Sequence, residues 1–134
     1  MIGALMLDIS GTTLTPEDID LLQAPQTGGL ILFARNIESP DQVRALTDHI
    51  RRVRPEILIA VDQEGGRVQR LKPEHGFTKL PAMGRLGELY ATEPHQALIM
   101  AQISGWLMAT EVLAVGIDFS FAPVLDIDDI SDVI

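Results

Sequence analysis

Residues 57–70 read ILIAVDQEGGRVQR, a stretch that changes abruptly from an apolar run to a cluster of charges around two glycines. The run Ile57–Val61 is rich in β-branched residues and has no polar alternation. This pattern is typical of a strand buried on both faces of a parallel sheet or barrel. Asp62 is the first polar residue after the run. Because ligand-binding groups gather at the carboxyl ends of parallel strands, the stretch predicts a site that begins at Asp62.

The second half of the stretch predicts a turn that returns basic groups toward Asp62. Gly65 and Gly66 allow backbone conformations and close approaches that a Cβ would prevent. Asp62 can accept hydrogen bonds from hydroxyl groups, and the planar guanidinium of Arg70 can donate to hydroxyl or carbonyl oxygens. An internal ion pair between Asp62 and Arg70 that only closes the loop is the alternative interpretation.

Composition limits the classes of partner. The chain has 134 residues, of which 46% are hydrophobic, and this is enough core material for one folded domain. With 10 basic and 19 acidic residues it carries a net charge of −9, which argues against nucleic acid or an anionic membrane as partner. There is no cysteine and no metal-ligand spacing, and neither a Gly-x-Gly-x-x-Gly nor a P-loop pattern follows a strand. We therefore expect no cofactor and no metal.

The sequence predicts neither a targeting signal nor a membrane span. The sequence begins without a basic segment followed by an apolar one, so a cytoplasmic location is expected. The apolar segment 97–107 is interrupted by Gln102, Ser104 and Gly105, and a buried helix is expected there rather than a membrane span. Trp106 is expected in the core with its apolar neighbours on this helix, which are Leu98, Ile99, Ile103, Leu107, Met108 and Leu113.

Apolar runs alternate with helical segments along the whole chain. Four runs, each followed or interrupted by polar residues, are expected to form strands: residues 4–7, 29–33, 57–61 and 117–124. Helices are expected after the capping residues Thr15 and Ser39, and a long one is expected from Thr92 to near Gly116. Residues 71–90 are expected to be irregular. The order of elements predicts a parallel α/β fold with right-handed crossovers, either an open sheet or a barrel.

One motif allows an alternative function. Residues 5–14, LMLDISGTTL, have the form of the phosphatases of the haloacid dehalogenase type, in which the first Asp is a phosphoryl-accepting nucleophile. Asp8 would take that role. Those enzymes normally carry a second Asp two residues later as general acid, and this chain has Ser10 there. Asp8 as a strand-end residue in a polar network is the simpler interpretation.

Three ordered motifs resemble the family 3 glycoside hydrolases, and among them the bacterial cytoplasmic β-N-acetylglucosaminidases (β-hexosaminidases) of peptidoglycan recycling. They are GGLILFARN at 28–36, VDQEGGRVQR at 61–70 and DFSFAPVLD at 118–126. Residues 77–83 and 105–109 match as well. The resemblance implies a (β/α)8 barrel of the TIM type. It also implies an enzyme that removes terminal β-1,4-linked N-acetylglucosamine from anhydro-muropeptides by a retaining mechanism, with no cofactor.

The resemblance places Asp62 and Arg70 at positions that bind the terminal sugar in this family. Asp62 would accept from the sugar hydroxyls, and Arg70 would hold the same end of the pocket. Glu64 and Arg67 would brace the loop. The expected partner is a small carbohydrate, N-acetylglucosamine joined to anhydro-N-acetylmuramyl peptides, and not nucleic acid or a membrane.

Length departs from the family. A (β/α)8 barrel takes about 250 residues, so residues 1–134 are expected to be the N-terminal part of one barrel domain, about half of it, truncated at the C-terminus. The family's nucleophile and acid/base residues would lie beyond position 134, and no catalytic residue is expected in this chain. Retaining hydrolysis needs both groups, so the chain alone is expected to be inactive. A non-catalytic sugar-binding remnant and a misfolded fragment are the alternatives. The sequence does not indicate the oligomeric state.

Overall fold

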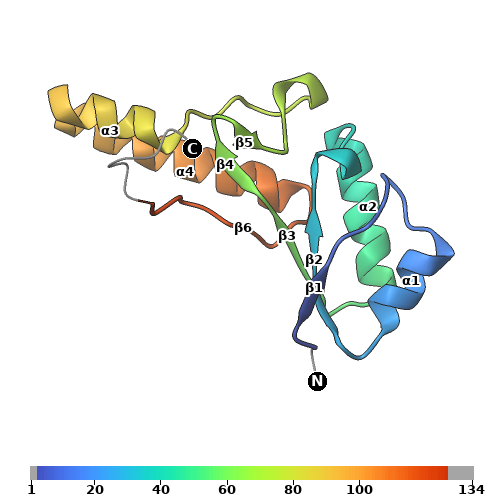
Figure 1. The fold of residues 1–134 in the computed structure, drawn as a ribbon. Helices are drawn as coiled ribbons and strands as arrows, with labels where there is room; N and C mark the ends of the chain where they lie inside the picture. The colour runs from blue at the N-terminus through green and yellow to red at the C-terminus, as the bar shows by residue number, and fades with distance from the viewer. Residues whose placement is uncertain (1–2, 127–134) are drawn as a thin grey trace.

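A computed structural model describes residues 3–126. Its main sheet contains β1 (Leu5–Leu7), β2 (Thr27–Leu32), β3 (Leu58–Val61) and β6 (Phe119–Ser120), hydrogen-bonded in that order. Every pair in this sheet is parallel, as the sequence predicts. The carboxyl ends of the strands therefore share one edge, which is the upper edge in Figure 1.

Two capped helices cover one face of this sheet. Figure 1 shows α1 (Pro16–Gln23) and α2 (Pro40–Val53) on the same side of β1 and β2. The Thr15 hydroxyl accepts from the backbone N–H of Asp18, whose carboxylate accepts from the N–H of Thr15, so the predicted cap forms fully. At α2, Ser39 accepts from the N–H of Gln42, but the Gln42 side chain accepts from Glu38 rather than from the N-cap.

The core lies between the sheet and these helices. Its buried members come from alternate positions of β2 and β3, which point to one face of the sheet, and from one stripe of α2, which includes Val43, Leu46 and Ile50. Each such side chain contributes about 1.5–3 kcal/mol when it is withdrawn from water. Leu58 is an exception to the prediction for β3, because it is 47% exposed while the other three strand residues are buried. β3 is therefore not buried on both faces along its whole length.

The connection between β3 and the last strand is more ordered than expected. A hairpin of β4 (Gln63–Gly65) and β5 (Val68–Gln69) follows β3 directly and stands above the carboxyl edge of the main sheet (Figure 1). The second part of the segment 71–90, which was predicted to be irregular, belongs to the helix α3 (Met83–Thr92). Two 3₁₀ turns, η1 (Ala34–Asn36) and η2 (Pro73–His75), complete the connections. The expected last strand, residues 117–124, is reduced to Phe119–Ser120.

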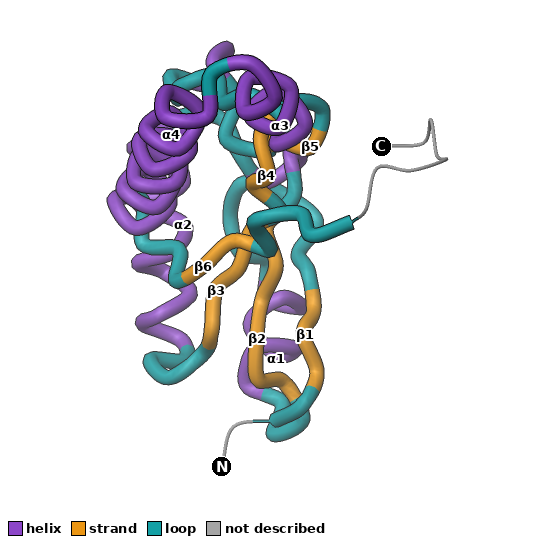
Figure 2. The backbone as a smooth tube through the Cα atoms, turned by 90° about the vertical axis from the view of Figure 1, so that its left-hand side faces the viewer, coloured by secondary structure: helices purple, strands orange, loops and turns teal. Residues whose placement is uncertain are grey.

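The long apolar helix α4 (Pro94–Ala114) differs most from the prediction. Figure 2 shows α4 at one side of the molecule, with α3 packed across its first turns. Met108 and Val112 face the core, but Trp106 is 68% exposed. Four more of the side chains predicted to be core residues are also exposed, so that prediction is wrong for them: Leu98, Ile99, Ile103 and Leu113. Within residues 3–126 this face of the helix is therefore largely exposed to solvent.

Helix α4 has one further property. Of the helices between residues 3 and 126, it is the one whose length and hydropathy would allow it to cross a membrane. Only 22% of its most apolar window is buried. Core helices of soluble proteins also meet these criteria of length and hydropathy, so they do not by themselves place α4 in a membrane.

Polar contacts fix the end of α4 and the start of β6. Gly116 ends α4 with a φ of 79°, and a Cβ there would lie 2.5 Å from the Thr47 hydroxyl oxygen. The Asp118 carboxylate pairs with Arg51 of α2 at 2.5 Å and accepts from the backbone N–H of Ile59 at 2.7 Å. These bonds hold β6 in register beside β3.

Candidate functional site

The hairpin brings Asp62 and Arg70 together at the carboxyl edge of the sheet. Asp62 leaves β3, and Arg70 follows β5 after the turn at Gly65 and Gly66. Arg70 Nη2 donates to Asp62 Oδ2 at 2.9 Å. The two side chains are 26% and 23% exposed, so the pair is partly desolvated and still reachable from solvent. This ion pair is the contact that the alternative interpretation expected, and the role of Asp62 and Arg70 in binding a sugar stays a prediction.

The two glycines make this return possible. Gly65 has a φ of 89° and Gly66 a φ of 58°, both in the left-handed region that favours glycine. A Cβ on Gly65 would lie 2.2 Å from the Pro81 carbonyl oxygen. The turn thus requires both the backbone conformation and the small size of glycine.

Arg70 keeps unused donor capacity. Its guanidinium carbon lies 5.9 Å from the centre of the Phe33 ring, and that of Arg35 lies 4.9 Å from the same ring. Among residues 3–126, no acceptor forms a hydrogen bond with Arg70 Nε, which is buried. A buried N–H without a partner is costly, so this donor is suited to a ligand oxygen.

A second carboxyl group lies beside Asp62. Desolvation raises the pKa of Glu64 above its ordinary value, and the hydrogen bond and negative charge of Asp62 raise it further. Arg70 opposes this shift, and Asp126, which follows β6, adds to it. The Glu64 carboxyl therefore holds its proton to a higher pH than an isolated glutamate, while Asp62 faces the cation of Arg70. Asp128, another possible strand-end carboxylate, lies outside the described residues.

Two buried glutamines that sequence reasoning missed support the loop. Gln63 is 0% exposed and accepts through Oε1 from the backbone N–H groups of Arg70 and Leu71, both at 2.9 Å. Gln69 is 4% exposed, and its amide bonds to Leu71, Thr78 and Leu80. The available signal was two uncharged amide side chains at facing positions of a short hairpin.

Other strand ends place polar groups at the same edge. Asp8, after β1, forms an ion pair with Arg35, which follows β2 and also donates to the Ile9 carbonyl at 3.2 Å. Asn36 donates to the carbonyl groups of Ile9 and Gly11 at 3.0 and 2.8 Å. Asp8 is therefore a strand-end residue in a polar network, as the simpler interpretation predicted.

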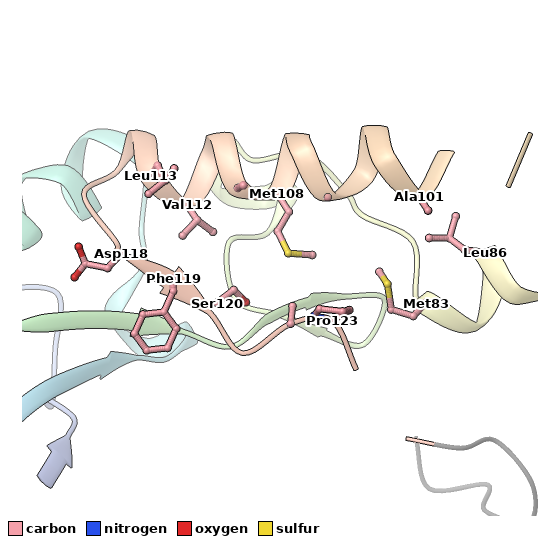
Figure 3. A pocket seen from close by; sticks show the side chains of 13 residues that line it. Met83, Leu86, Ala101, Met108, Val112, Leu113, Asp118, Phe119, Ser120 and Pro123 are labelled. Carbon is pink, nitrogen blue, oxygen red and sulfur yellow. The ribbon is translucent and has the colours of Figure 1, made fainter. Parts of the chain in front are cut away.

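A separate hollow of about 570 Å³ lies between α3, α4 and the segment around β6. Figure 3 shows Met83 and Met108 pointing into it from opposite sides, with Phe119 and Pro123 on the strand side. Its lining is mostly apolar, and neither Asp62 nor Arg70 takes part in it. No group of three or more potential metal ligands occurs in the described part of the chain.

Comparison with known proteins assigns the family. Residues 5–134 match the family described as "Glycosyl hydrolase family 3 N terminal domain". The chain therefore belongs to glycosyl hydrolase family 3. This assignment leaves the phosphatase alternative built on Asp8 without support, and the parallel α/β fold with its N-terminal part of a TIM-type barrel is confirmed.

The similar proteins carry consistent names. The chain is 59% identical to a "Beta-hexosaminidase" of Pseudomonas aeruginosa over 128 residues, which are 96% of this chain and 36% of that protein. It is 56% identical to a "Beta-hexosaminidase" of Alkalilimnicola ehrlichii, over 95% of this chain and 36% of that one. The chain thus spans little more than a third of the curated relatives it matches.

Solved structures agree in fold. The crystal structure of NagZ from Neisseria gonorrhoeae in complex with N-trifluoroacetyl-D-glucosamine matches with a TM-score of 0.90 and 46% identity, over 95% of this chain and 37% of that one. A glycoside hydrolase family 3 β-N-acetylglucosaminidase from Paenibacillus sp. matches with a TM-score of 0.78 and 32% identity, over 91% and 23%.

Proposed function

We propose that this chain is the part of a retaining exo-β-N-acetylglucosaminidase that binds the terminal sugar. The observation that carries the proposal is the Asp62–Arg70 pair at the carboxyl edge of the sheet, with a buried Nε–H of Arg70 left for a ligand. The relatives are named for hexosaminidase activity, and one similar structure holds an N-acylated glucosamine.

The chemistry of the pair suits a pyranose. The ionised Asp62 carboxylate accepts from vicinal hydroxyl groups, and Arg70 donates to the oxygens of the same ring edge. Phe33 offers an apolar surface beside the guanidinium. A sugar whose hydroxyl groups bind Asp62 and whose oxygens bind Arg70 has its non-reducing end fixed. This arrangement favours removal of a single terminal sugar.

The chemical step is assigned to a longer protein. Retaining hydrolysis requires a nucleophile and a separate acid/base group that flank the bond, and we place both outside residues 1–134. Within that protein the substrate is N-acetylglucosamine linked to anhydro-N-acetylmuramyl peptides, released during peptidoglycan recycling in the cytoplasm. The acidic balance of the chain is compatible with a sugar whose terminal residue is uncharged.

The test compares two forms of the protein. We expect release of 4-nitrophenol from its N-acetyl-β-D-glucosaminide by the longer protein and none by the 134-residue chain, which should still bind N-acetylglucosamine. Binding would be followed by the amide NMR signals of residues 62–70. Turnover by the 134-residue chain would place catalytic groups inside it and contradict the proposal. If no form of the protein binds the sugar or turns over the substrate, the proposed function is wrong.

A further inference from the structure

Gln63 makes hydrogen bonds next to both residues of the candidate site, with its side chain near Arg70 and with its backbone near Asp62. Its side chain is fully buried, and Oε1 accepts from the backbone N–H groups of Arg70 and Leu71 at 2.9 Å each, while Nε2 donates to the Leu71 carbonyl at 3.2 Å. The ladder between β4 and β5 ends at the Gln63–Gln69 pair. The Gln63 side-chain amide therefore makes the hydrogen bonds that a longer β4 strand would have made to the backbone groups of Arg70 and Leu71.

The backbone of Gln63 is fixed at the same time. Its N–H, which belongs to the peptide bond after Asp62, donates to the Ser120 hydroxyl oxygen at 3.0 Å. The same hydroxyl donates to the Gln63 carbonyl at 2.8 Å. Ser120 thus ties the peptide next to Asp62 to β6, on the opposite side from the hairpin.

We propose that Gln63 is the positioning residue of the Asp62–Arg70 pair, holding Asp62 through its backbone and Arg70 through its side-chain amide. The inference rests on the proposed function, because the ligand in question is the terminal sugar. The guanidinium of Arg70 contacts the Asp62 carboxylate and the Phe33 ring. The side chain can reach both only if the backbone at residue 70 keeps its position. Displacement of a positioning group by about 1 Å costs binding and rate, because the ligand atoms no longer meet both partners.

Gln69 provides a matched control within the same hairpin. It is the same residue type, is almost as buried, and its amide makes the same number of hydrogen bonds. Those bonds go to the carbonyl groups of Leu71 and Thr78, at 2.7 Å each, and to the N–H of Leu80 at 3.0 Å. None reaches the backbone N–H of Arg70 or the peptide next to Asp62.

The first test compares Gln63→Met with Gln69→Met in the form of the protein that binds the sugar. Both changes keep side-chain length and remove an amide, so both should lower the melting temperature to a similar degree. Gln63→Met should weaken N-acetylglucosamine binding about tenfold or more, while Gln69→Met should change it less than about threefold. Equal losses of affinity in the two variants would overturn the positioning role.

A second variant covers the case in which Gln63→Met fails to fold. Ser120→Ala removes the hydroxyl that holds the peptide after Asp62 and leaves the Gln63 amide in place. We expect it to weaken sugar binding several-fold, because both hydrogen bonds between this hydroxyl and the Gln63 backbone are lost. Unchanged affinity in a folded Ser120→Ala protein would contradict the inference.

A readout without sugar separates this inference from the proposed function. The Nε–H NMR resonance of Arg70, identified by its loss in Arg70→Lys, reports the direction and shielding of the guanidinium. It should be preserved in Gln69→Met and shifted or broadened in Gln63→Met. If the wild-type protein binds no sugar, the proposed function fails, and this comparison still decides whether Gln63 positions Arg70. An identical resonance in both variants would refute that role.

Discussion

Arg70 carries more hydrogen-bond donors than its neighbours between residues 3 and 126 accept. Its guanidinium donates to Asp62 through Nη2, and its buried Nε–H has no acceptor there. A fixed guanidinium with spare donors beside a carboxylate with spare lone pairs is complementary to a vicinal diol. The candidate site is thus a preformed pair of side chains, Asp62 and Arg70, rather than a single group.

Asp62 is the first residue to test. In the protein that binds N-acetylglucosamine, Asp62→Ala should weaken binding by about 1–3 kcal/mol, because the sugar hydroxyls and Arg70 lose their acceptor. The measurement is the sugar titration, with kcat/KM in the form that turns over. Asp48→Ala, which removes an exposed i,i+4 ion pair with Arg44 on α2, is the control and should leave both unchanged. Unaltered affinity in Asp62→Ala would remove Asp62 from the site.

Glu64 gives a prediction about pH. Because its pKa is raised in the folded protein, chiefly by burial and then by Asp62, the folded state holds the proton longer than the unfolded chain. The stabilisation is complete below the ordinary value of 4.5 and is lost as pH rises through the raised pKa. Carboxyl 13C NMR should show a Glu64 midpoint above 4.5 that moves down in Asp62→Asn. The same Glu64 midpoint in wild type and Asp62→Asn would contradict the contact between the two carboxyl groups.

The hairpin is the element that creates the site. Its antiparallel pair is short, and the turn depends on two glycines with positive φ. The buried amides of Gln63 and Gln69 add the hydrogen bonds that so short a ladder lacks. The element therefore depends on contacts with the segment around Leu80 as much as on its own strand pairing.

Gly65→Ala tests this element. The change puts a side chain at a φ of 89° and a Cβ against the Pro81 carbonyl, so we expect a loss of about 1–3 kcal/mol of stability. The control is Gly87→Ala inside α3, where a Cβ meets nothing within 4 Å and alanine should stabilise the helix by about 0.5–1 kcal/mol. Denaturant unfolding measures both. Equal stability of Gly65→Ala and wild type would mean that the turn tolerates a Cβ.

Between residues 3 and 126 the molecule is built on a four-stranded parallel sheet and a short hairpin, and one face of α4 is exposed. α4 presents Trp106 and several aliphatic side chains outward, and one of these, Leu113, also lines the hollow that Met83 and Met108 enter. A contiguous apolar surface of this kind is unusual on a soluble monomer.

Trp106 reports on this face directly, because it is the single tryptophan of the chain. At 68% exposure its fluorescence in the 134-residue chain should resemble that of free tryptophan and be quenched by iodide. The buried Met108 on the same helix gives a control, since Met108→Leu should leave the emission unchanged. A blue-shifted emission protected from iodide would show that the face is covered in solution and contradict the exposed placement.

Local sequence determined the order along the chain of the four main-sheet strands and of α1, α2 and α4, the N-caps of α1 and α2, and the glycine turn that returns Arg70 toward Asp62. These features depend on residues close in the chain, or on strand ends that a parallel sheet must bring to one edge. The family motifs lie in the same segments, so the family could be inferred with them.

Tertiary structure decided the roles of Gln63 and Ser120, the helix at residues 83–92 and the exposure of α4. The bond between Gln63 and Ser120 joins residues 57 positions apart, and no local pattern encodes it. The apolar composition of α4 predicts that it is buried, but burial depends on whether another element packs against it. Hydropathy shows which surface favours burial, and only the assembled chain shows which surface is buried.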